Sequence, residues 1–575
     1  MQELEGLFLA AVEAQRAGDS SAARRRFEEI LGRFPACHEA VFMLAMLDAD
    51  AGELASAERR LNEALRLDPG HPEYLFRLGS LQLARGRALE AVQTLRRAEA
   101  AGEEAGEVLL ALATAELQAG QVSEAETHAR RAIELDGHVA QADVLMMSIL
   151  GARRELGAAL EHARASAARH PENAEVRARL ALLLERANDL GGAVDEARAA
   201  LALRKDHPTA LGVVGRLLER EGKLEEAAQA FKDAVSACAP NSSEARDLCR
   251  SLGLVLDRMK RHDDAMRCFR ASKRDPRSLD EEFRRASEEV GRFIDAQIRD
   301  LPEGIAATWP RTPAEERPSP VFFVGFPRSG TTLLEQMLGA HPAIVTTDEL
   351  RNLGRVTETL AQPLGGLERL PRHLGSISEA EVVRARAEYW GVAEGELGAE
   401  ALAGKLLLDK HPLNTPNLFT ARRVFPGSKV VVSLRDPRDV VLSCFMNLSR
   451  TAAAVLHYGT LEDAARQYAQ VMKLWLHMRT ALDLPWLEVR YEDIVEQPEA
   501  TVGRVLEFVG QPWDDAVLRF VEKTAGKQVR STSYRQVTEG LYKRALGRWR
   551  AYEKHFGAAL PILEPFAQEF GYGDA

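Results

Sequence analysis

The chain has 575 residues, of which 46% are hydrophobic and 28% charged, and its formal net charge is -11 at pH 7. This length exceeds what one compact core can hold, so we expect two or more globular domains. An acidic chain without a basic stripe is not expected to bind nucleic acid, and no stretch approaches the about eighteen apolar residues of a membrane span.

The N-terminal stretch has neither the basic nor the apolar region of a secretory signal. The five cysteines are scattered without C-x-x-C spacing, as expected of reduced thiols in a reducing compartment. We therefore expect a cytoplasmic protein.

Residues 1–276 contain an internal repeat with a period of 34 residues. Alanine recurs at this period, and a residue that favours a turn, mostly glycine, lies five positions before it. A small residue lets two helices approach closely, while glycine accepts the left-handed backbone between them. The pattern therefore predicts helix–turn–helix units. The recurring alanines are Ala23, Ala57, Ala91, Ala125, Ala159, Ala193 and Ala227.

An eighth unit with longer spacing follows, marked by Ala265 and Pro276. The array resembles the tetratricopeptide repeat, in about eight copies. This resemblance implies an all-α solenoid with a concave face. It also implies that the array binds a protein partner or a polypeptide acceptor, with a scaffold or a dimer surface as the alternative. Its ligand and the oligomeric state stay open.

Residues 277–317 combine a helical pattern with a proline-rich stretch, so we expect a connector and linker there. The second domain is then expected at residues 318–575.

The stretch 321–338, VFFVGFPRSGTTLLEQML, predicts a buried strand, a loop and the start of a helix. Gly325 and Gly330 have the spacing of a phosphate-binding Walker loop, but Thr331 replaces its lysine. Backbone amides at such a helix start form an anion cradle. Arg328 adds a fixed cation inside the loop.

The segment Pro-Arg-Ser-Gly-Thr-Thr resembles the sulfotransferase family. In that family this loop binds the 5′-phosphosulfate of 3′-phosphoadenosine 5′-phosphosulfate, a co-substrate that needs no magnesium clamp. The resemblance implies that no metal is required. It assigns the donor contacts to Arg328, Ser329, Gly330, Thr331 and Thr332.

Glu349 lies 22 residues after Pro327. In the protein-tyrosine branch of the family, the catalytic glutamate has this offset, so the resemblance implies that Glu349 is the general base. It also implies that Arg351 orients either Glu349 or the acceptor. Asp348 and His411 are the next candidates for the base.

Lys410 follows the apolar run KLLLD and matches a family lysine that stabilises charge on the leaving oxygen, a role that Arg328 would share. The same run, ending in Asp409, has the form of a Walker B strand, which would hold magnesium in a nucleotide kinase or ATPase. That alternative stays open, as does a catalytically inactive interaction protein.

A second strand–turn–helix pattern covers GSKVVVSLRDPRDVVLSCFMNL. Arg435 follows the strand, and Ser443 lies eight residues later in the helix, so both can converge on one anion. This spacing resembles the 3′-phosphate site of sulfotransferases. The chain departs from the protein-tyrosine branch at Asn447, where that branch has arginine.

Three further donor contacts follow from the resemblance. Tyr491 stands where the protein-tyrosine branch has a nucleotide-contacting tyrosine. Lys543 and Arg544 lie in a segment similar to the loop that covers the nucleotide, and either could reach the 3′-phosphate.

Together, the motifs predict an all-α repeat solenoid followed by a P-loop-like α/β domain with a central parallel sheet. The resemblance implies a sulfotransferase that uses 3′-phosphoadenosine 5′-phosphosulfate. Its hydroxyl acceptor stays open between a protein tyrosine, a glycan, a lipid and a small molecule.

Overall fold

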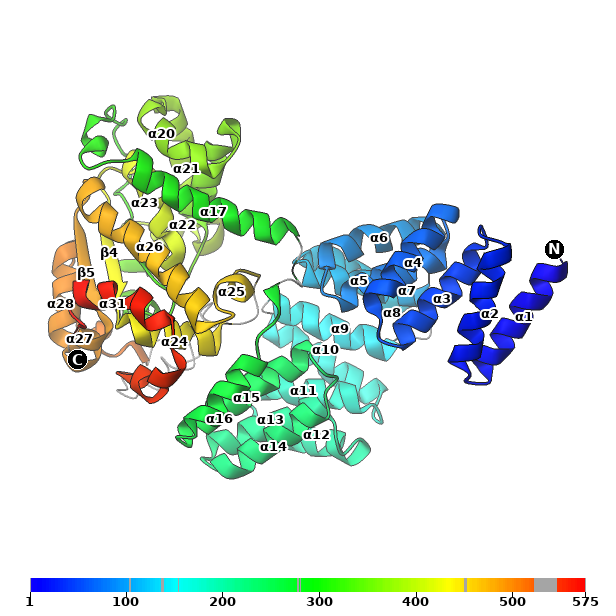
Figure 1. The fold of residues 1–575 in the computed structure, drawn as a ribbon. Coiled ribbons are helices and arrows are strands. Elements are labelled where there is room, and N and C mark those ends of the chain that lie inside the picture. The colour runs from blue at the N-terminus through cyan, green and yellow to red at the C-terminus, as the bar shows by residue number, and fades with distance from the viewer. Residues whose placement is uncertain are drawn as a thin grey trace. The chain divides into compact units, whose positions relative to one another are not determined.

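A computed structural model describes residues 2–102, 105–135, 139–153, 155–276, 279, 281–448, 452–521 and 545–573. The chain divides into two compact units (Figure 1). The first unit extends to Met259, and the second contains Lys260–Pro276 and the chain from Glu281 onward. Among the described helices, none is long and apolar enough to cross a membrane.

The first unit is all-helical, and consecutive helices pack in antiparallel pairs (Figure 1, blue to green). Its helices are α1 (Gln2–Arg16), α2 (Ser20–Arg33), α3 (His38–Asp50), α4 (Leu54–Leu67), α5 (Pro72–Ala84), α6 (Ala88–Ala100), α7 (Gly106–Gln118), α8 (Val122–Glu134), α9 (Val139–Ala152), α10 (Leu156–Arg169), α11 (Ala174–Arg186), α12 (Leu190–Leu203), α13 (Pro208–Arg220), α14 (Leu224–Ser236) and α15 (Ser243–Arg258).

The 34-residue period has a direct structural cause in this unit. All seven recurring alanines are fully buried, because each lies where the second helix of a pair approaches its neighbours. The predicted turn positions adopt a left-handed backbone, with φ of +80° at Gly18, +79° at Gly222 and +64° at Asn188. Arg154, which takes this position five residues before Ala159 although arginine does not favour a turn, lies outside the described residues. The predicted helical solenoid is confirmed.

The second unit is built on a five-stranded sheet in the order β2-β3-β1-β4-β5. Every neighbouring pair is parallel, as predicted. The strands are β1 (Val321–Gly325), β2 (Ile344–Thr346), β3 (Leu406–Lys410), β4 (Lys429–Leu434) and β5 (Trp486–Arg490).

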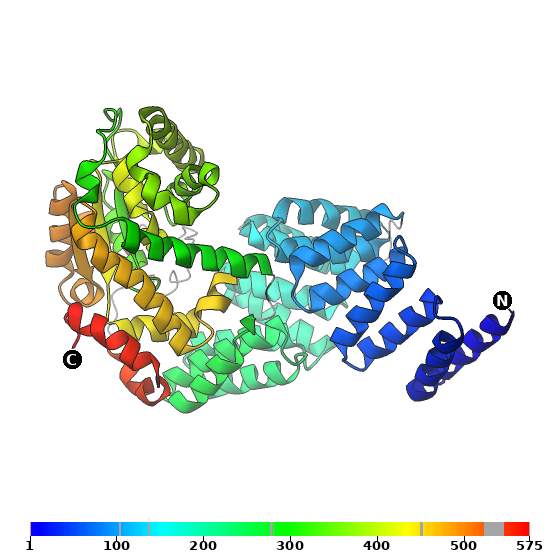
Figure 2. The ribbon, with the colours of Figure 1, turned by 45° about the horizontal axis from the view of Figure 1, so that its top comes forward.

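Helices cover this sheet and connect its strands. Figures 1 and 2 both show α17 alongside α26, and the two helices are in contact. The α-helices of the unit are α16 (His262–Ala271), α17 (Glu281–Asp300), α18 (Thr331–Gly339), α19 (Asn352–Ala361), α20 (Leu370–His373), α21 (Glu379–Leu397), α22 (Ala399–Leu402), α23 (Leu418–Val424), α24 (Pro437–Asn447), α25 (Ala452–His457), α26 (Leu461–Ala481), α27 (Tyr491–Glu496), α28 (Pro498–Val509) and α31 (Ala559–Glu569).

Helix α16, which the repeat pattern assigns to the eighth repeat, belongs by its contacts to the second unit. Asp263 forms ion pairs of 2.8 Å with both Lys554 and His555. Lys273 donates to the carbonyls of Phe445 and Leu448 at the end of α24. The segment Lys260–Pro276 therefore helps to hold α24, the helix that carries Ser443, in position.

The parallel sheet explains why candidate residues from distant parts of the sequence meet. Carboxyl ends of parallel strands share one edge, where α/β proteins place their ligands. The P-loop follows β1, Glu349 follows β2, Lys410 ends β3, Arg435 follows β4 and Tyr491 follows β5.

Candidate active site

The loop after β1 has the shape of an anion cradle. Gly330 caps α18 with φ of +99°, and a Cβ there would lie 2.5 Å from Cδ2 of Tyr491. Only glycine lets the tyrosine ring pack this closely on the loop. Thr331 and Thr332 begin the helix and are buried. The Ser329 hydroxyl is also buried and has no hydrogen-bond partner among the described residues.

Arg328 adopts a left-handed backbone, with φ of +71°. Its Nε donates to Ser443 Oγ at 3.1 Å, across 115 residues of sequence. Arg435 donates to the carbonyl of Arg328 at 3.2 Å. Arg328, from the first phosphate motif, therefore contacts both Arg435 and Ser443, from the second, at the edge of the sheet.

Arg435 is held so that part of its guanidinium lacks a partner. Its Cζ lies 4.9 Å from the centre of the Tyr491 ring, a cation–π contact. Its Nε is buried without a hydrogen-bond partner in the part of the chain that the structure describes. Asp436, the next residue, pairs with Arg438 at 2.8 Å, while Arg435 forms a longer ion pair of 3.7 Å with Asp439. These contacts leave Arg435 with a buried donor for an anion.

Asp439 is a structural residue that the sequence motifs did not identify. Its carboxylate accepts from the backbone N–H groups of Gly547 at 2.7 Å and Trp549 at 2.8 Å. It therefore fixes the C-terminal segment beside α24, where Arg435 also contacts the carbonyl of Ala545. Lys543 and Arg544, the two candidates in the covering loop, lie outside the described residues.

Glu349 and Lys410 form the other half of the site. Lys410 Nζ donates to Glu349 Oε1 at 2.7 Å, and the Glu349 N–H donates to the Lys410 carbonyl at 3.0 Å. Asp348 and Glu349 both have a left-handed backbone, with φ of +47° and +70°. The Glu349 side chain is 31% exposed, whereas that of Lys410 is completely buried. The candidate base is therefore partly accessible from solvent, whereas the cation bonded to it is not.

Glu335 lies behind this pair and was also missed by the sequence analysis. It projects from α18, is fully buried, and its Oε2 lies 2.9 Å from Lys410 Nζ. Burial raises the pKa of Glu335 to about 7, although Lys410 acts in the opposite direction. Burial by itself would lower the pKa of Lys410, but Glu335 and Glu349 outweigh it, so the pKa is raised and the ammonium form favoured.

Asp409, the candidate Walker B carboxylate, has a structural environment. It is fully buried, and it accepts hydrogen bonds from Tyr389 at 2.7 Å and Thr347 at 3.2 Å. Burial raises the pKa of Asp409 to about 6. The carboxylate therefore ties β3 to two neighbouring segments.

Arg351 is directed away from Glu349 in this structure. Its guanidinium pairs with Glu358, and its side chain is 67% exposed. A role of Arg351 in orienting the acceptor stays a prediction.

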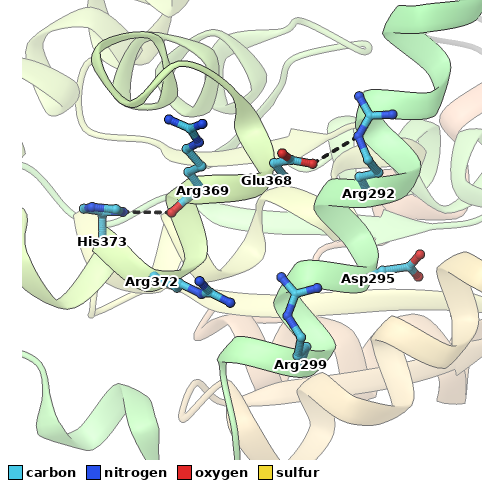
Figure 3. A pocket seen from close by; sticks show the side chains of 7 residues that line it. All are labelled: Arg292, Asp295, Arg299, Glu368, Arg369, Arg372 and His373. Carbon is cyan, nitrogen blue, oxygen red and sulfur yellow. Dashed lines mark hydrogen bonds and ion pairs between the residues drawn. The ribbon is translucent and has the colours of Figure 1, made fainter.

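A separate hollow of about 700 Å³ lies between α17 and the segment 368–373 (Figure 3). It contains none of the residues predicted from the motifs. Three of its arginines are already paired with carboxylates, Arg292 with Glu368 and Arg372 with Asp300, each at 3.0 Å, and Arg299 with Asp300 at 2.8 Å. The first two pairs connect α17 to the segment around α20.

Comparisons with known proteins address both halves of the chain. Residues 320–515 match a family model described as the sulfotransferase family. Residues 8–72, 42–106 and 192–243 match a model of the tetratricopeptide repeat. Both resemblances are confirmed by these matches.

Individual relatives match only part of the chain. An uncharacterized protein of Aquifex aeolicus is 27% identical over 257 residues, which are 43% of this chain and 32% of that protein. Protein-tyrosine sulfotransferase A of Caenorhabditis elegans is 25% identical over 268 residues, 44% of this chain and 68% of that protein. A tetratricopeptide repeat protein from Parabacteroides merdae has a TM-score of 0.40 at 16% identity, over 44% of this chain and 99% of that structure.

Proposed function

We propose that this chain, which carries tetratricopeptide repeats and a sulfotransferase-family domain, transfers a sulfuryl group from 3′-phosphoadenosine 5′-phosphosulfate to a hydroxyl acceptor. The observation that carries the proposal is the contact of Arg328, Arg435 and Ser443 beside the Lys410–Glu349 pair. One edge of the sheet thus combines an anion cradle with a base and a buried cation.

The residues present suit this donor. Ser329 Oγ and Arg435 Nε are buried donors without partners among the described residues, and such donors are costly unless a ligand or water satisfies them. The loop amides with Ser329, Thr331 and Thr332 would hold the 5′-phosphosulfate, and Arg435 with Ser443 the 3′-phosphate. Tyr491 would shape the cradle by packing on Gly330.

The chemical roles follow from exposure and charge. The bound donor supplies an activated sulfuryl group on a phosphate leaving group. Glu349, the partly exposed carboxylate, takes the proton of the acceptor hydroxyl as its oxygen bonds to sulfur. The bond from sulfur to the bridging oxygen breaks, and the electron pair remains on the phosphate. Lys410 and Arg328 stabilise that charge.

We further propose a polypeptide acceptor, with a protein tyrosine as the first candidate. The support is the similarity to proteins named protein-tyrosine sulfotransferases and the presence of a repeat array of a kind that binds polypeptides. The array would recruit the acceptor or a partner protein.

One experiment tests donor and acceptor together. The full chain is incubated with radiolabelled donor in a host lysate, and the labelled product is identified by mass. A labelled polypeptide is expected. A labelled glycan, lipid or small molecule would support sulfuryl transfer but overturn the proposed polypeptide acceptor.

A kinase or ATPase is distinguished by thermal shift. We expect stabilisation by 3′-phosphoadenosine 5′-phosphate without added metal. Stabilisation by ADP with magnesium, but not by 3′-phosphoadenosine 5′-phosphate, would overturn the proposed donor.

A further inference from the structure

Glu335 is a buried carboxylate that takes part neither in the proposed donor cradle nor in the proposed proton transfer to Glu349. It lies on α18, directly after the P-loop. Its Oε2 is 2.9 Å from Lys410 Nζ, and its Oε1 accepts from the Asp348 N–H at 3.1 Å. Burying a charged group is unfavourable unless it is paired, so an acid at this position needs a partner such as Lys410.

Lys410 lies between two carboxylates with different access to solvent. Glu335 is fully buried behind it, and Glu349 is partly exposed in front of it. When Glu349 accepts a proton, it becomes neutral and its attraction for the ammonium falls. Asp348 Oδ1 is 4.0 Å from Lys410 Nζ, too far for a hydrogen bond. Glu335 is then the nearest ionic partner in the described part of the site.

We propose that Glu335 is a positioning residue that keeps Lys410 in place and protonated while Glu349 takes the proton of the acceptor. This inference rests on the proposed function, in which the Lys410 ammonium stabilises the leaving oxygen. Glu335 exchanges no proton with the substrate, and it acts only through Lys410.

This role has a pH signature. The charged groups around Glu335 are Lys410 on β3 and Asp348 and Glu349 in the loop after β2. His411, next to Lys410, is partly buried, and this burial lowers its pKa. Burial raises the pKa of Glu335 to about 7, so the carboxylate is ionised above that pH and neutral below it. Turnover should therefore fall as the pH decreases through about 7.

The substitution Glu335→Gln keeps the shape and removes the charge. We expect kcat to fall by about 10- to 100-fold, the cost of a misplaced catalytic group. The decrease in turnover near pH 7 should disappear. The donor KM and the affinity for 3′-phosphoadenosine 5′-phosphate, measured by calorimetry, should stay within about twofold, because Glu335 lies behind Lys410 and not in the anion cradle.

Asp409→Asn is the matched control, because Asp409 is equally buried and adjacent to Lys410 in sequence, but its hydrogen bonds go to Tyr389 and Thr347. It should keep the pH dependence of the wild type. A Glu335→Gln variant with the kcat and pH profile of the wild type would overturn the proposal.

A double variant keeps the proposal testable if Glu335→Gln does not fold. Lys410→Met with Glu335→Gln removes both charges of the pair, so neither is left buried alone. If Glu335 acts through Lys410, the double variant should turn over at the rate of Lys410→Met. A further decrease of about tenfold or more would overturn the proposal. Absence of transfer by the wild type refutes the proposed function itself, whereas transfer that Glu335→Gln leaves unchanged refutes only the role of Glu335.

Discussion

The repeat array, which is the first unit, and the second unit, called the transferase unit here because residues 320–515 match the sulfotransferase family, differ in where the left-handed backbone occurs. In the array it occurs at turns, at glycines such as Gly18 and Gly222, and at Asn188. In the transferase unit, Arg328, Asp348 and Glu349 adopt it with long or charged side chains. Each such residue costs roughly 1–3 kcal/mol and persists only where its surroundings hold it. The left-handed residues of the array are thus glycines or asparagines, whereas three of the five left-handed non-glycine residues described in the transferase unit lie at the candidate site, the other two being Lys260 and Asp483.

Buried charge follows the same division. In the array, buried Asp48 pairs with Arg24 at 2.6 Å and Arg60 at 3.1 Å. Those arginines are partly exposed, so they anchor a carboxylate from the surface. In the transferase unit the cation itself, Lys410, is fully buried. The first arrangement stabilises packing, and the second suits a cation that meets a substrate in a site with little water.

Glu349→Gln should have the largest effect on the transferase side of this comparison. It keeps the side-chain volume and removes the base, so turnover should fall by about 10²–10⁴-fold. The affinity for 3′-phosphoadenosine 5′-phosphate should hardly change, because other residues form the anion cradle. Steady-state kinetics and calorimetry measure the two effects.

Acceptors of graded acidity separate the base from the cation. A more acidic phenol needs its base less, so it should partly restore Glu349→Gln but leave much of the defect of Lys410→Met. Glu388 is partly exposed and accepts a hydrogen bond from Thr359, so Glu388→Gln provides the control. Wild-type turnover by Glu349→Gln would make Glu349 a structural carboxylate and leave Asp348 or His411 as the base.

Gly330→Ala and Gly222→Ala test the comparison with one substitution in each unit. Both positions are left-handed, so both variants should lose about 1–2 kcal/mol of stability. A Cβ at Gly222 meets nothing within 4 Å, whereas at Gly330 it lies 2.5 Å from Tyr491. Only Gly330→Ala should therefore weaken binding of 3′-phosphoadenosine 5′-phosphate, by about 100-fold or more if two charge-assisted contacts are lost. Thermal melting and calorimetry measure the two quantities. Equal donor affinity in both variants would contradict the cradle.

Arg435→Ala should weaken binding of the same nucleotide by about 10- to 100-fold. The guanidinium would contribute a charge-assisted contact worth roughly 1.5–3 kcal/mol. Arg466→Ala is the control, because Arg466 is 63% exposed and pairs with acids on its own helix. Unchanged affinity of Arg435→Ala in calorimetry would refute the 3′-phosphate assignment.

Sequence patterns predicted different features of the two units: buried positions in the array and candidate site residues in the transferase unit. Periodicity identified the seven recurring alanines of the array, all of which are buried, because every repeat places them in the same surroundings. The family motifs identified Arg328, Arg435, Ser443, Lys410 and Glu349, and the strand ends explain why these residues lie close together. Their roles stay predictions.

Contacts between distant segments could not be derived in this way. Glu335 interrupts the apolar pattern of α18, but only the position of β3, about 75 residues later, gives it Lys410 as a partner. In the same way, only the fold brings the Asp439 carboxylate to the N–H groups of Gly547 and Trp549. Local patterns cannot specify which long-range partner a buried charge will meet.

The smallest expected effect is the change in donor affinity when the array is deleted at Met259, the boundary between the two units. Deleting residues 1–259 should leave donor affinity within about twofold, because every donor residue lies in the second unit. Turnover on the natural acceptor should decrease, because the array that recruits it is gone.

Deletion of residues 1–276, at the boundary predicted from the repeats, also removes Asp263 and Lys273. The ion pairs to Lys554 and His555 and the contacts at the end of α24 are then lost. This longer deletion should lower the melting temperature and weaken nucleotide binding, since α24 carries Ser443. Thermal melting and calorimetry on both proteins compare them directly. If the two truncations behave alike, α16 does not support the site, and full turnover of the shorter deletion on the natural acceptor would show that the array does not recruit it.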